Sequence, residues 1–384
     1  MPSLKAAQTP DGKVVLTRKF LSGMEEYAKL WQGRMRVIME PTEERSDNLD
    51  NVELHRHEIP FTLRLLPFDA KELAVVFHDA SLVVGTAHQH SHKMLAASKR
   101  ARVPIVFIYE YSLQTRLQVV RETTPNLARR WRRYVWQLGQ ERRNLSTASK
   151  AAGIQCNGTP TYDAYNRYNP HSLLFFDTRV RSDMVITEGE LERRLRRMFL
   201  GHPIRLAFSG RLDPIKGVKY LVPLARELRD RLIPFHLTIM GDGPEFDRVQ
   251  MEVMEAGLIG HVDMTGTLQF ETELVPTMKG SVDVFVCPHV QGDPSCTYLE
   301  TLACGVPIVG FDNQAFEGLV RKTNTGWTTP MHDVRSLAAK IVEIAANKME
   351  LAQRSRAARR FALQHTMEKT FAARVEHLRA SAKV

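Results

Sequence analysis

The stretch from Val282 to Phe311 constrains the fold of this chain most, and it reads VDVFVCPHVQGDPSCTYLETLACGVPIVGF. Its first apolar run, residues 284–287, is typical of a fully buried strand. Asp293 is predicted to cap a helix that follows directly and stops at Gly305. A second apolar run, residues 306–309, predicts the next strand. The loop and the helix N-terminus should therefore lie at the carboxyl edge of a sheet, where open α/β sheets bind ligands and where an anion is favoured.

Strand-like and helix-like segments alternate through both halves of the chain, which favours parallel βαβ units. The length of 384 residues is enough for two domains. We expect an N-terminal domain over residues 1–185, a second domain over 186–366, and a C-terminal helix over 367–384 that crosses back to the first. A long helical region from 113 to 149 is expected to be interrupted at Pro125.

The composition limits the partners and the compartment. A net charge of +10 favours anionic partners, which include phosphorylated substrates, nucleic acid and acidic lipid surfaces, and composition alone does not choose among them. No apolar run approaches the roughly 18 residues of a membrane span. The N-terminal residues lack the apolar centre of a signal peptide. Four cysteines without a CxxC pair favour a reducing, cytoplasmic setting.

The segment SGRLDPIKG, residues 209–217, places two cations around a turn that contains Pro214. Arg211 can hold phosphate oxygens in a bidentate manner, and Lys216 adds a compact positive charge. Both would lie at the same sheet edge as the loop of Asp293. A solvated turn whose cations only face water is the alternative, and the paired loop favours phosphate binding.

Three phrases, GRLDPIKG, IMGDGPE and DPSCTYLETLACGVPIVG, together resemble the signature order of retaining GT-B glycosyltransferases of family 4. The resemblance covers about residues 204–345 firmly and the first half more loosely. It implies an α/β GT-B fold, in which two Rossmann-like domains face each other across a cleft. It also implies transfer of a sugar from a nucleoside diphosphate sugar to an acceptor hydroxyl, with retained configuration and without a metal or another cofactor. By the same resemblance, Arg211 and Lys216 bind the donor diphosphate and Glu300 binds the donor ribose.

The chain departs from the family at the first of two glutamates, whose place is taken by Gly292. Asp293, one position later, is the expected substitute for contacting the transferred sugar. The donor site would also include backbone groups that lie near the base, at the start of the helix, and directly after the strand that ends at Ser209. These residues are Gly266, Thr267 and Leu268, then Ser295, Cys296 and Thr297, and finally Gly210.

In the first half, VPIVFIYEYS resembles the family strand that ends in a histidine near the reacting sugar, and Glu110 takes that place here. Gly23 would correspond to the glycine-rich turn that approaches the donor phosphates. His90 is a candidate for the acceptor side. The triplet of His88, His90 and His92 also admits a metal site, if the three share one face of a strand, but we expect no metal.

Seven arginines lie between Arg121 and Arg143, interleaved with tryptophan and tyrosine. This composition fits an anionic membrane surface, and an arm that binds nucleic acid has a similar one. A solvated helix packed by its tryptophans is the third possibility, and we regard nucleic acid as the least favoured partner. The expected role is in cell-surface polysaccharide or glycolipid biosynthesis, with a saccharide or lipid-linked acceptor. Two alternatives are a nucleotide-sugar epimerase and a non-catalytic sugar-nucleotide-binding subunit of a membrane assembly.

Overall fold

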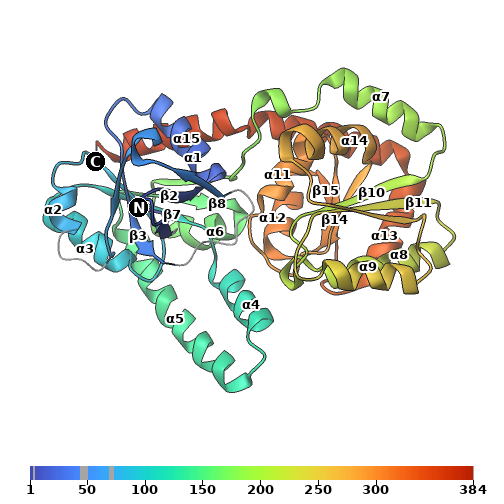
Figure 1. The fold of residues 1–384 in the computed structure, drawn as a ribbon, viewed down its shortest axis with the longest axis horizontal. Coiled ribbons are helices and arrows are strands. Elements are labelled where there is room, and N and C mark those ends of the chain that lie inside the picture. The colour runs from blue at the N-terminus through green and yellow to red at the C-terminus, as the bar shows by residue number, and fades with distance from the viewer. Residues whose placement is uncertain (3–4, 44–50, 69–72, 384) are drawn as a thin grey trace. The chain divides into compact units, whose positions relative to one another are not determined.

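The computed structural model describes residues 1–2, 5–43, 51–68 and 73–383. The chain forms two compact units (Figure 1). The first consists of Met1–Leu113, Trp131–Phe175 and Met367–Val384, and the second of Gln114–Arg130 and Phe176–Thr366. Relative to the expected limits, residues 114–130 and 176–185 belong with the second unit.

The second unit is built on a six-stranded parallel sheet in the order β12-β11-β10-β13-β14-β15. Counted along the chain, this is the order 3-2-1-4-5-6 of a doubly wound sheet, and the direction of winding reverses between β10 and β13. The strands are β10 (Ile204–Ser209), β11 (Phe235–Met240), β12 (Val262–Gly266), β13 (Val284–Cys287), β14 (Ile308–Phe311) and β15 (Gly326–Thr329).

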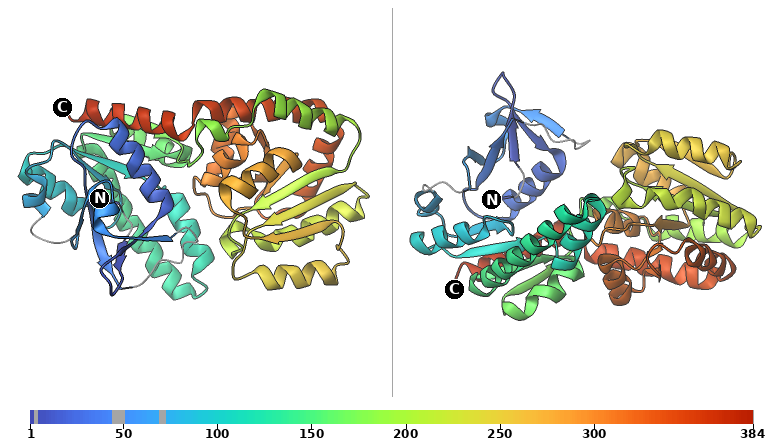
Figure 2. Two further views of the ribbon diagram at one scale, coloured as in Figure 1. Left: turned by 45° about the horizontal axis from the view of Figure 1, so that its top comes forward. Right: turned by 90° about the horizontal axis from the view of Figure 1, so that it is seen from below.

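Helices cover both faces of this sheet (Figure 2). Strands β13 and β14 are fully buried, and alternate side chains of the sheet enter two separate apolar cores. Phe208 belongs to the core that contains α8 and α13, and Ala207 to the core that contains α11 and α12. The helices are α7 (Glu188–Phe199), α8 (Leu221–Asp230), α9 (Phe246–Glu255), α10 (Val275–Ser281), α11 (Cys296–Ala303), α12 (Gln314–Thr323), α13 (Val334–Ala346) and α14 (Lys348–Gln364).

The first unit contains a four-stranded parallel sheet, β6-β7-β8-β9, and a five-stranded sheet, β4-β2-β1-β3-β5. In the second of these, β2 runs antiparallel to both β1 and β4, so this sheet is mixed. The strands are β1 (Lys5–Gln8), β2 (Val14–Thr17), β3 (Arg36–Thr42), β4 (Asn51–Leu54), β5 (Thr62–Leu65), β6 (Val83–Thr86), β7 (Ile105–Tyr109), β8 (Gly153–Asn157) and β9 (Ser172–Phe175). Its helices are α1 (Arg18–Leu30), α2 (Leu73–Phe77), α3 (Ser91–Ala101), α6 (Gly158–Tyr165) and α15 (Met367–Ser381), together with most of α5 (Leu127–Lys150).

The long helical region is interrupted where Pro125 predicts. Helix α4 (Leu113–Thr123) ends before this proline, and α5 begins after it. Arg130 donates hydrogen bonds to the carbonyls of Thr124 and Pro125, so its guanidinium helps to hold the connection. Within the described part of the chain, none of the helices combines the length and the apolar character that crossing a bilayer requires.

Candidate functional site

Three loops meet at the carboxyl edge of the six-stranded sheet, around the reversal between β10 and β13. Glycine allows their backbones to touch. A Cβ atom on Gly217, whose φ is +69°, would lie 1.8 Å from the carbonyl oxygen of Pro288, and one on Gly241 would lie 2.0 Å from that of Gly210. The amide of Val290 also donates to the carbonyl of Ile215 at 3.1 Å. The loop after β10 is therefore fixed against the loops after β11 and β13.

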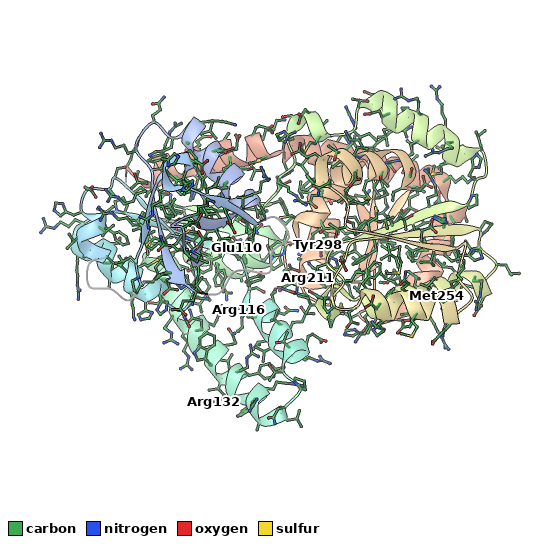
Figure 3. The ribbon with its side chains drawn as sticks, viewed as in Figure 1. Glu110, Arg116, Arg132, Arg211, Met254 and Tyr298 are labelled. Atoms are coloured by element: carbon green, nitrogen blue, oxygen red, sulfur yellow. The ribbon has the colours of Figure 1, made fainter. Side chains whose placement is uncertain are left out.

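Arg211 and Lys216 lie in the loop after β10. Asp213 caps the short helical turn Pro214–Lys216 by accepting hydrogen bonds from the amides of Ile215 and Lys216. The Arg211 side chain is about half exposed (Figure 3), whereas Lys216 is largely buried. Lys216 Nζ lies 3.8 Å from Asp293 Oδ2. The loops of Lys216 and Asp293, which the sequence predicts at one sheet edge, therefore lie against each other in the structure.

The start of α11 differs from the expectation. The helix begins at Cys296 with Ser295 as its N-cap residue, so Asp293 precedes the helix and does not cap it. The loop turns once more before the helix, because the amide of Ser295 donates to the carbonyl of Asp293 at 2.8 Å. Asp293 therefore faces Lys216 across the edge. Ser295, Cys296 and Thr297 remain at the helix start, where Ser295 Oγ bonds Thr297 Oγ1 at 3.2 Å and caps no amide.

Glu300 lies on α11 and forms an ion pair that the sequence did not indicate. Arg179 Nε donates to Glu300 Oε1 at 2.8 Å, and the guanidinium of Arg179 lies 3.7 Å from the centre of the Phe270 ring. Arg179 belongs to the segment that enters the second unit, 121 residues before Glu300. No local pattern marks such a long-range pair.

The predicted base-binding residues follow β12, at the same sheet edge. Gly266 has a φ of +71° and its carbonyl accepts from the amide of Gly241 at 2.8 Å, so this loop joins the loop after β11. Thr267 is exposed, and Leu268 packs partly against the apolar core that contains α11. Gly210 directly follows β10, and its amide donates to the carbonyl of Met240 at 3.0 Å.

In the first unit, Glu110 directly follows β7 (Figure 3), and its carboxylate accepts a 2.7 Å hydrogen bond from Asn157 Nδ2 at the end of β8. The interpretation of Gly23 as part of a glycine-rich turn is wrong. Thr17 caps α1, and Gly23 lies inside that helix. A Cβ atom at Gly23 would lie 3.1 Å from the ring of Phe371, so close packing against α15 accounts for this glycine.

The three histidines that admitted a metal site do not share a strand. His88 and His90 lie in the turn after β6, and His92 lies in the first turn of α3. His88 stacks on Phe68, its Nδ1 accepts from the amide of His90 at 3.0 Å, and burial lowers the pKa of His88 to about 4. Among the described residues, no group of three histidine, cysteine or acidic side chains is arranged to hold a metal ion.

Comparison with known proteins agrees with this architecture. Residues 199–361 match the family model described as Glycosyl transferases group 1. A GDP-mannose-dependent alpha-(1-6)-phosphatidylinositol monomannoside mannosyltransferase of Mycolicibacterium smegmatis is 29% identical over 208 residues, which are 52% of this chain and 54% of that protein. A 2-deoxystreptamine glucosyltransferase of Streptomyces kanamyceticus is 29% identical over 126 residues, which are 32% of each chain. The matched part thus spans between about a third and about half of these relatives.

Among solved structures, Anabaena Alr3699/HepE in complex with UDP superposes with a TM-score of 0.66 at 13% identity, and covers 96% of this chain and 97% of that one. A likeness at this identity concerns the fold. The chain therefore has the GT-B fold of the α/β class, and residues 199–361 are similar to the glycosyl transferases group 1 family.

Proposed function

We propose that this protein is a retaining glycosyltransferase, which moves a sugar from a nucleoside diphosphate sugar to an acceptor hydroxyl without a bound metal. The second unit binds the donor. The acceptor is a saccharide or a lipid-linked saccharide, and the product belongs to cell-surface polysaccharide or glycolipid synthesis in the cytoplasm. The phosphatidylinositol monomannoside mannosyltransferase named above supports a lipid-linked saccharide as the acceptor.

The observation that carries the proposal is the meeting of Lys216 and Asp293 at the point where the sheet reverses. Ligands of doubly wound sheets bind in this crevice. The Lys216 side chain is largely buried, its Nζ lies 3.8 Å from Asp293 Oδ2, and Arg211 lies in the same loop. Cations in such a position can neutralise the negative charge that develops on a leaving diphosphate. An epimerase would share this donor site, but none of the relatives named here is one.

In the proposed reaction, the bond between the anomeric carbon and the diphosphate oxygen breaks, and the diphosphate leaves with the electron pair. The acceptor oxygen forms a bond to the same carbon on the same face, and its proton passes to a diphosphate oxygen. Arg211 and Lys216 bind the diphosphate, Glu300 holds the ribose, and Asp293 holds the transferred sugar. No protein nucleophile is needed, because the attack occurs on the face that the leaving group vacates.

The experiment is a transfer assay with a panel of UDP- and GDP-sugars, in which release of nucleoside diphosphate is followed with and without candidate acceptors. We expect release that depends on the acceptor. Lys216→Ala should lower kcat/KM by at least roughly tenfold, because a charge-assisted hydrogen bond contributes about 1.5–3 kcal/mol. Lys219→Ala is the matched control, since Lys219 is an exposed lysine three residues further on. Interconversion of donor sugars without transfer, or binding without turnover, would contradict the proposal.

We further propose that α5 attaches the protein to an anionic membrane surface. Trp131, Val135 and Leu138 follow each other at i, i+4 and i+7 on one face of α5, with exposed fractions of 70%, 52% and 51%. Arg132 (Figure 3) and Arg143 lie on an adjacent stripe of the same helix and are also exposed. An apolar stripe flanked by arginines suits the boundary between acidic headgroups and acyl chains. Nucleic acid fits this face less well, because Trp131, Val135 and Leu138 carry no charge that could bind phosphate.

A further inference from the structure

The loop between β13 and α11 is held by α4, a helix from a much earlier part of the chain. Thr115 Oγ1 donates to the carbonyl of Gly292 at 2.8 Å, and the amide of Gly292 donates to Gln118 Oε1 at 2.8 Å. Thr115 is completely buried. The two side chains are three positions apart and so share one face of α4. Together they bind both polar groups of the Gly292 backbone.

This contact leaves little room for a side chain at position 292. A Cβ atom on Gly292 would lie 3.2 Å from Gln118 Oε1 and 3.3 Å from both Cβ and the amide nitrogen of Gln314. Any side chain there would push against α4 and α12. The side chains that this part of the loop can offer to a ligand therefore come from the neighbours of Gly292.

The two neighbours of Gly292 carry buried oxygen atoms that lack a partner. Gln291 is 7% exposed, and neither its Oε1 atom nor Oδ1 of Asp293 has a hydrogen-bond partner in the described part of the protein. Both atoms are hydrogen-bond acceptors, and a buried acceptor without a donor is costly. A phosphate at neutral pH brings further acceptors, whereas hydroxyl groups bring donors. These atoms therefore fit a ligand rich in hydroxyls, next to the phosphate-binding Lys216.

We propose that Thr115 and Gln118 are positioning residues for the transferred sugar, and that Gln291 is a sugar-binding residue beside Asp293. By holding Gly292, α4 fixes the loop so that Gln291 Oε1 and Asp293 Oδ1 accept hydrogen bonds from sugar hydroxyls. This inference rests on the proposed function, because it assigns the sugar end of the same donor site. It adds α4 and Gln291 to the residues that act on the donor.

The contact of α4 with Gly292 is tested by amide hydrogen exchange, which requires no activity. Thr115→Val keeps the shape and removes the donor, whereas Thr115→Ser keeps the hydroxyl. Gln118→Leu removes the acceptor for the Gly292 amide, whereas Gln118→Glu keeps one. The Val and Leu variants should exchange the Gly292 amide faster than wild type, and the Ser and Glu variants should not. Thr123→Val is the matched control, because the exposed Thr123 hydroxyl donates only within α4, to the carbonyl of Val119.

The effect on binding of the transferred sugar is tested by calorimetry. UDP with UDP-glucose and GDP with GDP-mannose are titrated into the wild type, and the variants are measured with whichever of these two pairs binds. Thr115→Val and Gln291→Met should bind the nucleotide sugar roughly three- to tenfold more weakly, the loss expected for one net hydrogen bond, and should bind the free diphosphate unchanged. Gln291→Glu retains an acceptor oxygen and should restore most of the affinity.

Equal weakening of both ligands, or an unchanged Gly292 exchange rate in Thr115→Val and Gln118→Leu, would overturn the inference. Failure of the proposed function is a separate result. It would appear as a wild-type protein that binds nucleotide sugars but transfers nothing, and the exchange and binding comparisons would still decide whether α4 positions the loop.

Discussion

One of the two carboxylate oxygens of Glu300 already accepts a hydrogen bond from Arg179. A ribose can use the second oxygen, or it can displace the guanidinium. The stacking of Arg179 on Phe270 at 3.7 Å favours the first course, because it holds the guanidinium independently of Glu300. In the proposed donor site, the ion pair would orient the carboxylate and leave its second oxygen for a ribose hydroxyl.

Substitutions at the two carboxylates should separate the two ends of the donor. Glu300→Gln should weaken binding of both the nucleotide sugar and the free nucleoside diphosphate, because both contain the ribose. The expected loss is roughly tenfold, since a hydrogen bond to a charged group is replaced by a neutral one. Asp293→Asn should weaken only the intact nucleotide sugar and lower kcat. Calorimetry on both ligands checks this.

Asn at position 293 also tests the ion pair with Lys216, because it is isosteric and neutral. If Asp293→Asn weakens the sugarless nucleotide as strongly as Glu300→Gln does, Asp293 acts on the phosphate end of the donor, through Lys216. That outcome would remove Asp293 from the sugar site.

At this scale, the sequence could predict the meeting of Lys216 and Asp293 but not the contacts of Glu300 and Gly292. The loops of Lys216 and Asp293 each follow an apolar strand, and parallel strands end at a common edge, so local patterns were enough to pair these loops. Arg179, Thr115 and Gln118 reach the site from 121 to 177 residues away in the chain. Such contacts depend on how whole elements pack, and they leave no periodic trace around the residue itself.

Among the elements, α11 is held at its carboxyl end by a buried arginine and by the amide of Ile186, which donates to the carbonyl of Ala303 at 2.8 Å. Arg194 of α7 donates to the carbonyls of Cys304 and Gly305, where a helix presents unpaired acceptors. Burial lowers the pKa of Arg194 to about 10, which still leaves it charged at neutral pH. The charge of Arg194 lies at the negative end of the dipole of α11. The helix that carries Glu300 is therefore fixed at the end opposite the loop of Asp293.

The helix α5 differs from an ordinary surface helix, because several of its polar side chains are buried and several of its large apolar side chains are exposed. Gln140, Asn144 and Thr147 are buried and bonded inside the first unit, where Gln140 and Asn144 form a side-chain hydrogen bond of 2.9 Å. The exposed face carries Trp131 and Leu138 instead. The sequence indicated the basic and aromatic composition. It could not indicate which face is exposed, because the buried face also carries polar side chains.

Removing charge from this helix should release the protein from anionic vesicles. The triple variant Arg132→Ser, Arg142→Ser and Arg143→Ser avoids Arg130, which holds the connection to α4. Each cation near an anionic surface contributes about 1 kcal/mol, so partitioning should weaken by roughly a hundredfold. Binding should also fall with rising salt, because the attraction is screened. Sedimentation with vesicles that contain phosphatidylserine, and with neutral ones, measures this.

The matched control removes three charges from the second unit, with Arg193, Arg226 and Lys322 replaced by Ser. All three side chains are exposed. If this control loses vesicle binding to the same extent, the net charge of the protein and not α5 drives the attachment. Equal binding of the wild type to neutral and anionic vesicles would also contradict the proposal.

For the molecule as a whole, the chain contributes residues 114–130 to the second unit, leaves the first unit again after β9 to form the rest of the second, and returns as α15. The sequence predicted a terminal helix over 367–384 that crosses back to the first domain, and α15 belongs to the first unit, but the sequence did not indicate which residues make the contact. The contact centres on Arg374 and Gln155, which are both buried. Arg374 Nε donates to Gln155 Oε1 at 2.9 Å, and Gln155 Nε2 donates to the Arg374 carbonyl at 3.0 Å. The guanidinium also lies 4.1 Å from the centre of the Phe175 ring.

Because α15 closes over β8, the first unit should depend on residues that are last in the sequence. Arg374→Met keeps much of the side-chain volume but leaves the Gln155 amide oxygen buried without its donor. We expect a loss of about 2–3 kcal/mol, from the unpaired group and the lost cation–π contact. Amide hydrogen exchange should accelerate in β7, β8 and β9, while β10 to β15 keep their rates. The same substitution at Arg360, which is exposed on α14, should change neither set. Equal acceleration in both units would mean that they unfold together, and unchanged rates in β8 would show that α15 does not stabilise the first unit through Arg374.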